Sequence, residues 1–180
     1  PLDAKIKQGK VEYSSSSVQL YYNRAKLYRK IKDYDNALKN YFVADQVHTQ
    51  YVGAIDANKG NITSSTAVCY LNMGNYPKAI ETFRSALAIF EKVLGEKHEY
   101  IATTFNNIAY TYEKMGDYPN AINYYKKAIG MEETIKGKSS VDLVITYESL
   151  AALYNNLEKY SEGIECYNRI LEIKEANKES

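Results

Sequence analysis

The sequence predicts an all-α protein, an α-solenoid of four antiparallel helix pairs. The first observation is a 42-residue period, because alanine recurs at that spacing as Ala25, Ala67, Ala109 and Ala151. The second is that each of these alanines is followed by one tyrosine three residues later and by another nine residues later. A period of roughly 20 to 50 residues is typical of solenoids, in which each unit buries its apolar face against its neighbours.

The third unit shows how one repeat is built. Apolar residues recur at helical spacing over residues 105–112 and again over residues 118–128. Between the two runs, Gly116 can adopt the left-handed conformation that ends a helix, and Asp117 can cap the next helix. Pro119 is tolerated in a first helical turn. The unit is therefore predicted to be two antiparallel helices joined by a tight turn.

The other units follow the same pattern, with Lys32 and Glu158 in place of the turn glycine and Gly163 in place of a helix alanine. Gly53, Gly95 and Gly137 recur between units and predict short connections. Helices are expected at 16–31 and 34–51, 56–73 and 76–94, 98–115 and 118–136, and 140–157 and 160–176. The repeats are expected to span residues 16–52, 53–94, 95–136 and 137–177. Residues 1–15 are expected to form an N-terminal segment or the tail of a preceding repeat.

Composition restricts the classes of partner. The 180 residues carry a net charge of only +1, so the basic excess required for non-specific nucleic-acid binding is missing. No run of 18 apolar residues is present, so no membrane insertion is expected. Cys69 and Cys166 lie on predicted apolar helix faces and are expected to be free thiols of a cytoplasmic protein. Because the chain opens on Pro1, we expect a fragment of a larger protein.

The sequence offers no motif for catalysis or for a cofactor. His48 and His98 have no cysteine, histidine or carboxylate at metal-ligand spacing, and His98 is expected to begin a helix. A glycine-rich phosphate loop and a nucleophile elbow are both missing from the sequence. We therefore expect neither enzyme activity nor a bound cofactor or metal.

The units resemble the tetratricopeptide repeat (TPR). The resemblance covers roughly residues 18–175, and in the third unit it rests on Ala109, Tyr112, Gly116, Tyr118, Ala121, Tyr125 and Ala128. It implies a right-handed superhelix. Because the period is 42 residues rather than about 34, and because residues 93–98 lead into Ala102–Ala109, the chain resembles the longer repeats of kinesin light chains. Ser140 and Asp56 stand where His98 stands in the third unit, so a kinesin light chain cargo-binding domain is the less favoured reading.

The resemblance implies that the first helices of successive pairs line a concave groove that binds extended peptides. The candidate groove residues are Tyr22, Asn23, Lys26, Arg29, Lys30, Asn72, Asn106, Asn107, Tyr110, Lys114 and Asn155. Asparagine side chains can hydrogen-bond both the N–H and C=O groups of an extended chain. The cations of the first unit can hold an acidic side chain or a terminal carboxylate, and a solvated basic surface is the alternative.

Three functions are consistent with this pattern. The leading hypothesis is a scaffold for protein–protein interaction that binds an extended peptide or a partner helix in the groove. The second is a regulatory or targeting domain of a multidomain enzyme or receptor, with the groove closed by another part of that chain. The third is self-association through the terminal repeats, where a polar outer face is normally needed. The apolar residues expected to be exposed there are Ile164, Tyr167, Leu171 and Ile173.

Overall fold

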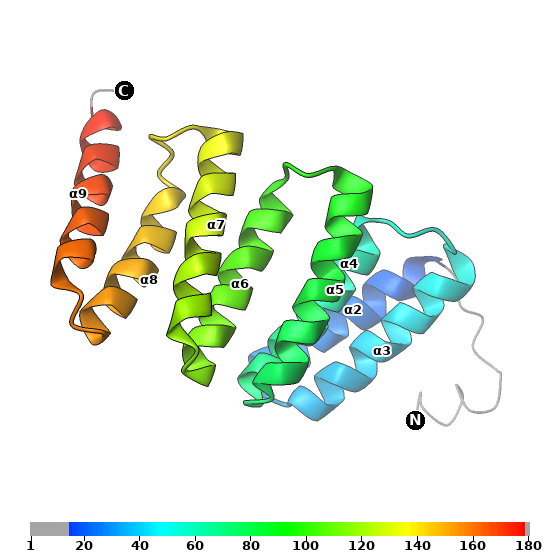
Figure 1. Ribbon diagram of the computed structural model, residues 1–180. Coiled ribbons are helices and arrows are strands. Elements are labelled where there is room, and N and C mark those ends of the chain that lie inside the picture. The colour runs from blue at the N-terminus through cyan, green and yellow to red at the C-terminus, as the bar shows by residue number, and fades with distance from the viewer. Residues whose placement is uncertain (1–14, 179–180) are drawn as a thin grey trace.

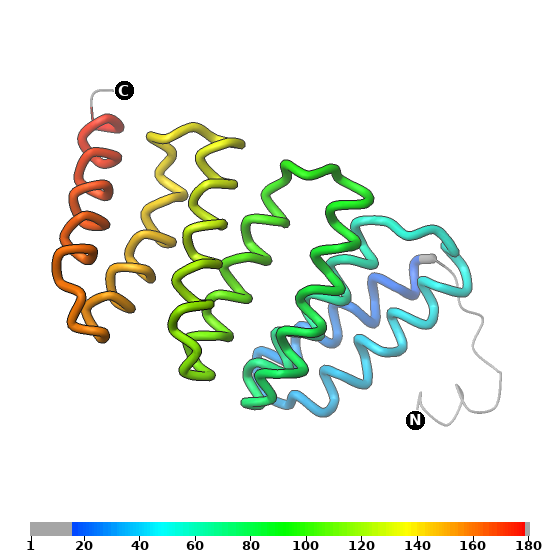
Figure 2. Tube along the Cα trace, viewed as in Figure 1, coloured from blue at the N-terminus to red at the C-terminus, as the bar shows by residue number. Residues whose placement is uncertain are grey.

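The computed structural model describes residues 15–178, and the described chain is all-α (Figure 1). Its helices are α2 (Ser15–Lys30), α3 (Tyr34–Tyr51), α4 (Ala57–Asn72), α5 (Tyr76–Leu94), α6 (Glu99–Met115), α7 (Tyr118–Lys136), α8 (Leu143–Asn156) and α9 (Tyr160–Ala176). Successive helices form antiparallel pairs that stack along one curved array, with α2 and α9 at opposite ends (Figure 2). The predicted fold class is confirmed. The segment at the amino end, residues 1–14, lies outside the described residues.

Seven of the eight described helices begin within one residue of the predicted start. The exception is α8, which begins at Leu143 rather than at residue 140. Asp56 and His98 cap α4 and α6 by accepting hydrogen bonds from the backbone N–H groups of the first turn. Asp142 makes no such bond, and its carboxylate lies 2.6 Å from Lys136 Nζ. Residues 141–142 form a turn ahead of α8 rather than part of the helix.

The turns inside the pairs follow the predicted pattern. Gly116 has φ of +86°, and the next residue, Asp117, accepts a hydrogen bond from the backbone N–H of Asn120. Lys32 and Glu158 adopt the same left-handed conformation with φ of +61° and +58°. This conformation costs a residue with a Cβ roughly 1–2 kcal/mol. The left-handed turn is therefore kept at these two positions although lysine and glutamate prefer a negative φ.

The repeated alanines lie at the centre of the helix pairs. Ala25, Ala67, Ala109 and Ala151 are all fully buried, as the period predicts. The core is nevertheless divided. One apolar cluster fills the first helix pair and includes Ile62 and Cys69 of α4, and a larger one runs through the second, third and fourth pairs. A small cluster of Ala86, Phe90 and Ile101 joins the second pair to the third.

The first helices of the pairs lie on the inner side of the array. Helix α2 contacts α4, and α4 contacts α6, more extensively than any second helix contacts the next second helix. Tyr22 Oη and Ser65 Oγ lie 3.2 Å apart across α2 and α4. Asn106 Nδ2 donates to Thr146 Oγ1 at 2.9 Å across α6 and α8. The surface formed by α2, α4, α6 and α8 is called the inner face below.

Candidate functional site

The inner face carries two stacked pairs of a lysine and a tyrosine. On α2, Lys26 Nζ lies 5.6 Å from the centroid of the Tyr22 ring, and on α6, Lys114 Nζ lies 4.9 Å from that of Tyr110. An ammonium group over an aromatic face is attracted by the ring quadrupole, by about 0.5–1 kcal/mol at exposed sites. These predicted groove residues therefore present combined aromatic and cationic surfaces rather than isolated charges.

Three predicted groove residues come together at the boundary between α6 and α8. Asn106, Asn107 and Tyr110 line a cavity of about 190 Å³. The opposite wall comes from α8, with Ile145, Thr146 and Ser149. This cavity, called the α6–α8 cavity below, is polar on both walls and is large enough for a small side chain or a short length of backbone.

A hydrogen-bond network fixes Asn106 in that cavity. Its Nδ2 donates to Thr146 Oγ1 at 2.9 Å and approaches Glu132 Oε1 at 3.4 Å, while Thr146 Oγ1 donates to Glu132 Oε2 at 3.3 Å. Burial raises the pKa of the Glu132 carboxyl, although the bond from Thr146 and the charge of Lys136 oppose this. Asn106 Oδ1 is buried and has no hydrogen-bond partner within residues 15–178. A buried acceptor without a partner costs roughly 1–3 kcal/mol, so an incoming N–H donor would be stabilised there.

The remaining predicted residues are placed elsewhere. Asn23 is exposed and accepts a hydrogen bond from Gln19, and Lys30 and Asn72 are exposed near the carboxyl ends of α2 and α4. Arg29 is half-buried, and its positive charge acts on Tyr41, whose pKa burial raises to about 12, and on the Cys69 thiol. Part of the Arg29 side chain therefore faces the interior of the solenoid rather than the surface where a peptide would bind.

Asn155 belongs to a second cavity, of about 440 Å³, at the α8–α9 end of the array. The other polar wall residue from α8 is Asn156, and α9 contributes Tyr160, Ile164 and Tyr167. The predicted residues are therefore spread over the α2 surface, the end of α4 (Asn72), the α6–α8 cavity with Lys114 of α6 beside Tyr110, and this terminal cavity.

A polar cluster that the repeat pattern did not predict lies where α3 meets α4. His48 is only 2% exposed, and its Nε2 lies 2.8 Å from Asp56 Oδ1. Burial raises the pKa of Asp56, but the hydrogen bond from the backbone N–H of Lys59 and the charge of His48 outweigh it and lower the pKa overall. Lys59 Nζ also lies 2.5 Å from Asp45 Oδ1. The available signal was positional, because Asp56 occupies the repeat position of the capping residue His98.

Both cysteines are buried and free, as predicted. Burial raises the pKa of Cys69 to about 11 and also raises that of Cys166. Within the described residues, no cluster of histidine, cysteine and carboxylate side chains has the composition of a metal site. None of the described helices is long and apolar enough to cross a membrane.

Sequence profiles of the tetratricopeptide repeat match residues 61–133 and, separately, residues 18–41 and 145–177. The chain is a TPR protein. Together the matched segments include parts of all four helix pairs, so the identification does not depend on the third unit alone. No curated protein sequence is significantly similar to this TPR chain.

Several solved structures share the fold. BtubC (BKLC) from P. vanneervenii superposes with a TM-score of 0.79 and 21% identity, over 89% of this chain and 64% of that one. A Rap protein complexed with competence and sporulation factor superposes with a TM-score of 0.77 and 22% identity, over 94% of this chain and 46% of that one. The TPR-like repeats of a putative kinesin light chain of Podosopora anserina superpose with a TM-score of 0.74 and 15% identity, over 90% of this chain and 77% of that one. The chain thus spans less than two thirds of the first two proteins, and the likeness concerns the fold, including that of kinesin-light-chain-like repeats.

Proposed function

We propose that this TPR domain binds an extended peptide on its inner face, with the α6–α8 cavity as the central contact. TPR domains generally mediate protein–protein interactions, and a Rap protein of similar fold was solved in complex with competence and sporulation factor. The observation that carries the proposal is the buried Asn106 Oδ1, which has no hydrogen-bond partner within the described residues. A backbone N–H of a bound peptide would satisfy it. The proposal assigns no reaction to the domain.

The charges of the inner face favour an acidic peptide. Lys26 and Lys30 are exposed on α2, and Lys114 is exposed on α6. Each can pair with a carboxylate at the cost of little desolvation, and each such exposed pair contributes no more than about 1 kcal/mol. The cations therefore favour a negatively charged partner, whereas the buried Oδ1 atom of the half-buried Asn106 supplies the larger energetic contribution. The buried thiols Cys69 and Cys166 suit a reducing compartment, and we place the domain in the cytoplasm.

Peptide selection followed by a pair of asparagine variants tests the proposal. Peptides captured from a random phage-displayed library by the wild-type protein would be synthesised and titrated by fluorescence anisotropy. Replacement Asn106→Ala should weaken binding about tenfold or more, because it removes a buried hydrogen bond worth 1–3 kcal/mol. Asn123→Ala, at an exposed position of the second helix α7, serves as the matched control. Equal affinity of wild type and Asn106→Ala for every captured peptide would refute this site.

A second function, self-association through the last repeat, is favoured by one exposed surface. Ile164, Tyr167 and Leu171 of α9 are 60%, 53% and 56% exposed. The equivalent positions of the third repeat are buried or half-buried beside α8. Ile173, expected to be exposed, is in fact 1% exposed, because it points into the core between α8 and α9.

Sedimentation analysis of the wild type and of Tyr167→Glu tests this second function. Self-association through α9 predicts that the wild-type mass rises with concentration and that the variant remains monomeric at every concentration. A wild type that is monomeric throughout would rule this surface out as an interface between copies.

A further inference from the structure

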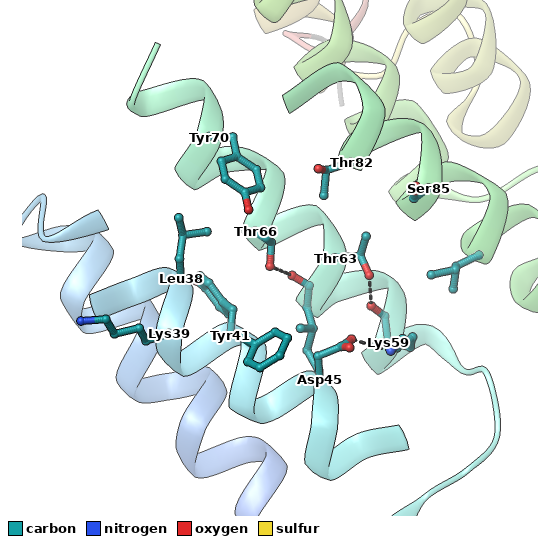
Figure 3. A pocket seen from close by; sticks show the side chains of 13 residues that line it. Leu38, Lys39, Tyr41, Asp45, Lys59, Thr63, Thr66, Tyr70, Thr82 and Ser85 are labelled. Atoms are coloured by element: carbon teal, nitrogen blue, oxygen red, sulfur yellow. Dashed lines mark hydrogen bonds and ion pairs between the residues drawn. The ribbon is translucent and has the colours of Figure 1, made fainter. Parts of the chain in front are cut away.

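A larger cavity, of about 590 Å³, lies on the side of the second helices, between α3 and α5 and over α4 (Figure 3). Thr63 and Thr66 of α4 form its floor, and Thr82 and Ser85 of α5 form one side. Leu38 and Tyr41 of α3 form the other side. This cavity, called the α3–α5 cavity below, shares no residue with the α6–α8 cavity and is not used by the proposed function.

The 42-residue period shows why the space exists. The equivalents of Thr63 and Thr82 in the third repeat are Phe105 and Tyr124. Those two rings pack with their centroids 6.0 Å apart, and Tyr124 also stacks on Tyr112 at 5.6 Å. Tyr112 has a counterpart at the α3–α5 cavity in Tyr70. The positions of Tyr124, which stacks on Tyr112, and of Phe105, which packs on Tyr124, are held by threonines there.

The cavity is thus the space that two aromatic side chains fill one repeat later. A third, smaller side chain enlarges the cavity, because Thr66 occupies the position that the fully buried Ile108 occupies in the third repeat. Phe42, which also lines the cavity, is 62% exposed. Apolar side chains from α3, a tyrosine ring from α4 and hydroxyl groups on α4 and α5 therefore surround a space of aromatic size that the chain itself leaves open.

The charges around the cavity are mostly positive. Lys39 and Lys59 line it, and Lys78 Nζ lies 4.6 Å from the centroid of the Tyr70 ring. Asp45 is the one acidic lining residue, and because it pairs with Lys59 at 2.5 Å, the net positive charge of the lining is that of Lys39. A negative group next to the inserted ring would therefore meet complementary charge.

We propose that the α3–α5 cavity binds a partner polypeptide by taking up one of its aromatic side chains, with an acidic residue of the same segment beside the lysines. The ring would pack against Tyr70 and Leu38, as Tyr124 stacks on Tyr112 in the third repeat. Four hydroxyl groups around the cavity favour tyrosine. Those of Thr63, Thr66, Thr82 and Ser85 each donate to a backbone carbonyl of their own helix, and each keeps a lone pair that can accept a hydrogen bond from a phenol O–H. Buried aromatic anchors of this kind carry much of the energy of protein interfaces.

The decisive variant fills the cavity with the side chains of the third repeat. Thr63→Phe combined with Thr82→Tyr should close the site and raise the melting temperature, because the added rings bury apolar surface in existing space. Thr134→Phe adds a ring at an exposed position of α7 and serves as the matched control. Should the double variant fail to fold, the single variant Thr82→Tyr, which narrows the site, takes the place of the double variant in the same measurements.

Two measurements with defined probes test the site. The first titrates 4-methylphenol, the tyrosine side-chain analogue, into labelled protein and follows backbone amide NMR signals. We expect saturable shifts confined to α3, α4 and α5 in the wild type and in Thr134→Phe, and their loss in the filled variant. No saturable shift up to the solubility limit, or equal shifts in the filled variant, would overturn the proposal.

The second measurement takes phage-displayed peptides captured by the wild type and titrates them against two variants. Peptides that use the α3–α5 cavity should contain an aromatic residue next to an acidic one. They should bind the filled variant about tenfold or more weakly and bind Asn106→Ala with unchanged affinity. Peptides that lose affinity only with Asn106→Ala would support the inner face and, if all captured peptides behave so, would reject the α3–α5 cavity.

Discussion

The junction between the first and second repeats differs in chemistry from the junction between the second and third. At the α3–α4 junction, Asp45 pairs with Lys59. Forty-two residues later, at the α5–α6 junction, Leu87 and Ile101 belong to one apolar cluster. The same helix arrangement is therefore held by an ion pair in one place and by apolar packing in the other.

The same contrast recurs where the second helix of one pair ends and the first helix of the next pair begins. His48 and Asp56 bond to each other at the α3–α4 junction. Their equivalents Phe90 and His98 instead both pack against Tyr100, with ring centroids 5.2 and 4.9 Å away. The polar junction leaves a cavity and divides the apolar core, whereas the apolar junction does neither. The fold thus tolerates a poorly filled junction as long as its neighbours are packed.

The largest expected effect comes from truncating the apolar junction. Ile108→Ala removes a fully buried side chain and should cost about 2–5 kcal/mol of unfolding free energy. Thr66→Ala, the equivalent change at the polar junction, should cost less than about 1 kcal/mol, because Thr66 already borders open space and bonds only its own helix. Urea unfolding of both variants measures the difference. Equal losses would show that the α3–α5 cavity is closed in solution.

The next effect concerns how closely α4 approaches its partner. Gly60 occupies the repeat position of Ala102, and a Cβ at Gly60 would collide with the Phe90 ring. Gly60→Ala should therefore destabilise the protein by about 1–3 kcal/mol, although alanine is the better helix former. Gly163→Ala is the control, because its Cβ would meet only ordinary contacts, at 3.7 Å or more, and should stabilise α9 by roughly 0.5–1 kcal/mol. Stabilisation by both substitutions would contradict the close packing at Gly60.

The sequence predicted the scaffold well because the period carries the information that a solenoid needs. Buried alanines, left-handed turns and capping residues recur at fixed positions, and each acts locally. The α3–α5 cavity was not predicted, because it depends on which side chains fill equivalent positions on three different helices. Comparing Thr63 with Phe105 and Thr82 with Tyr124 in the sequence would have exposed it.

The candidate site was predicted less well than the fold. Helical spacing identified the inner face but not the cross-repeat bonds that decide which of its residues are available. Asn106 is held by Thr146, 40 residues away, and the charge of Arg29 acts on the pKa of Tyr41 on another helix. Those partners follow from the packing of helices rather than from position within one helix. The periodicity therefore predicted which helix face is the inner face, whereas the α6–α8 cavity on that face follows from helix packing and was not predicted.

The pair of His48 and Asp56 predicts a stability loss in acid that is specific to the polar junction. The pKa of Asp56 is lowered in the folded state, so its carboxylate stabilises the fold above its ordinary pKa, and this contribution is lost as the pH falls through the lowered value. Asp56→Asn should cost about 1 kcal/mol near pH 7, a modest figure because the side chain is 35% exposed and screened by solvent. The gap between wild type and variant should close as the pH falls below the lowered pKa of Asp56. A gap that is independent of pH would show that the charge of Asp56 contributes nothing.

The smallest effect comes from converting the ion pair of the polar junction into the apolar pair of its neighbour. Lys59→Ile alone removes the ion-pair partner of Asp45, and Asp45→Leu alone leaves Lys59 with only its hydrogen bond to Thr49. Each single change should therefore be neutral or slightly destabilising. The double variant should be neutral or more stable than wild type by about 1 kcal/mol, because replacing a partly buried ion pair with packed apolar residues often has that effect. Urea unfolding of the four proteins gives the coupling between the two positions. If the double variant is less stable than both singles, then the α3–α4 junction depends on its charges, and its difference from the α5–α6 junction is a requirement of the local packing rather than a tolerated variation.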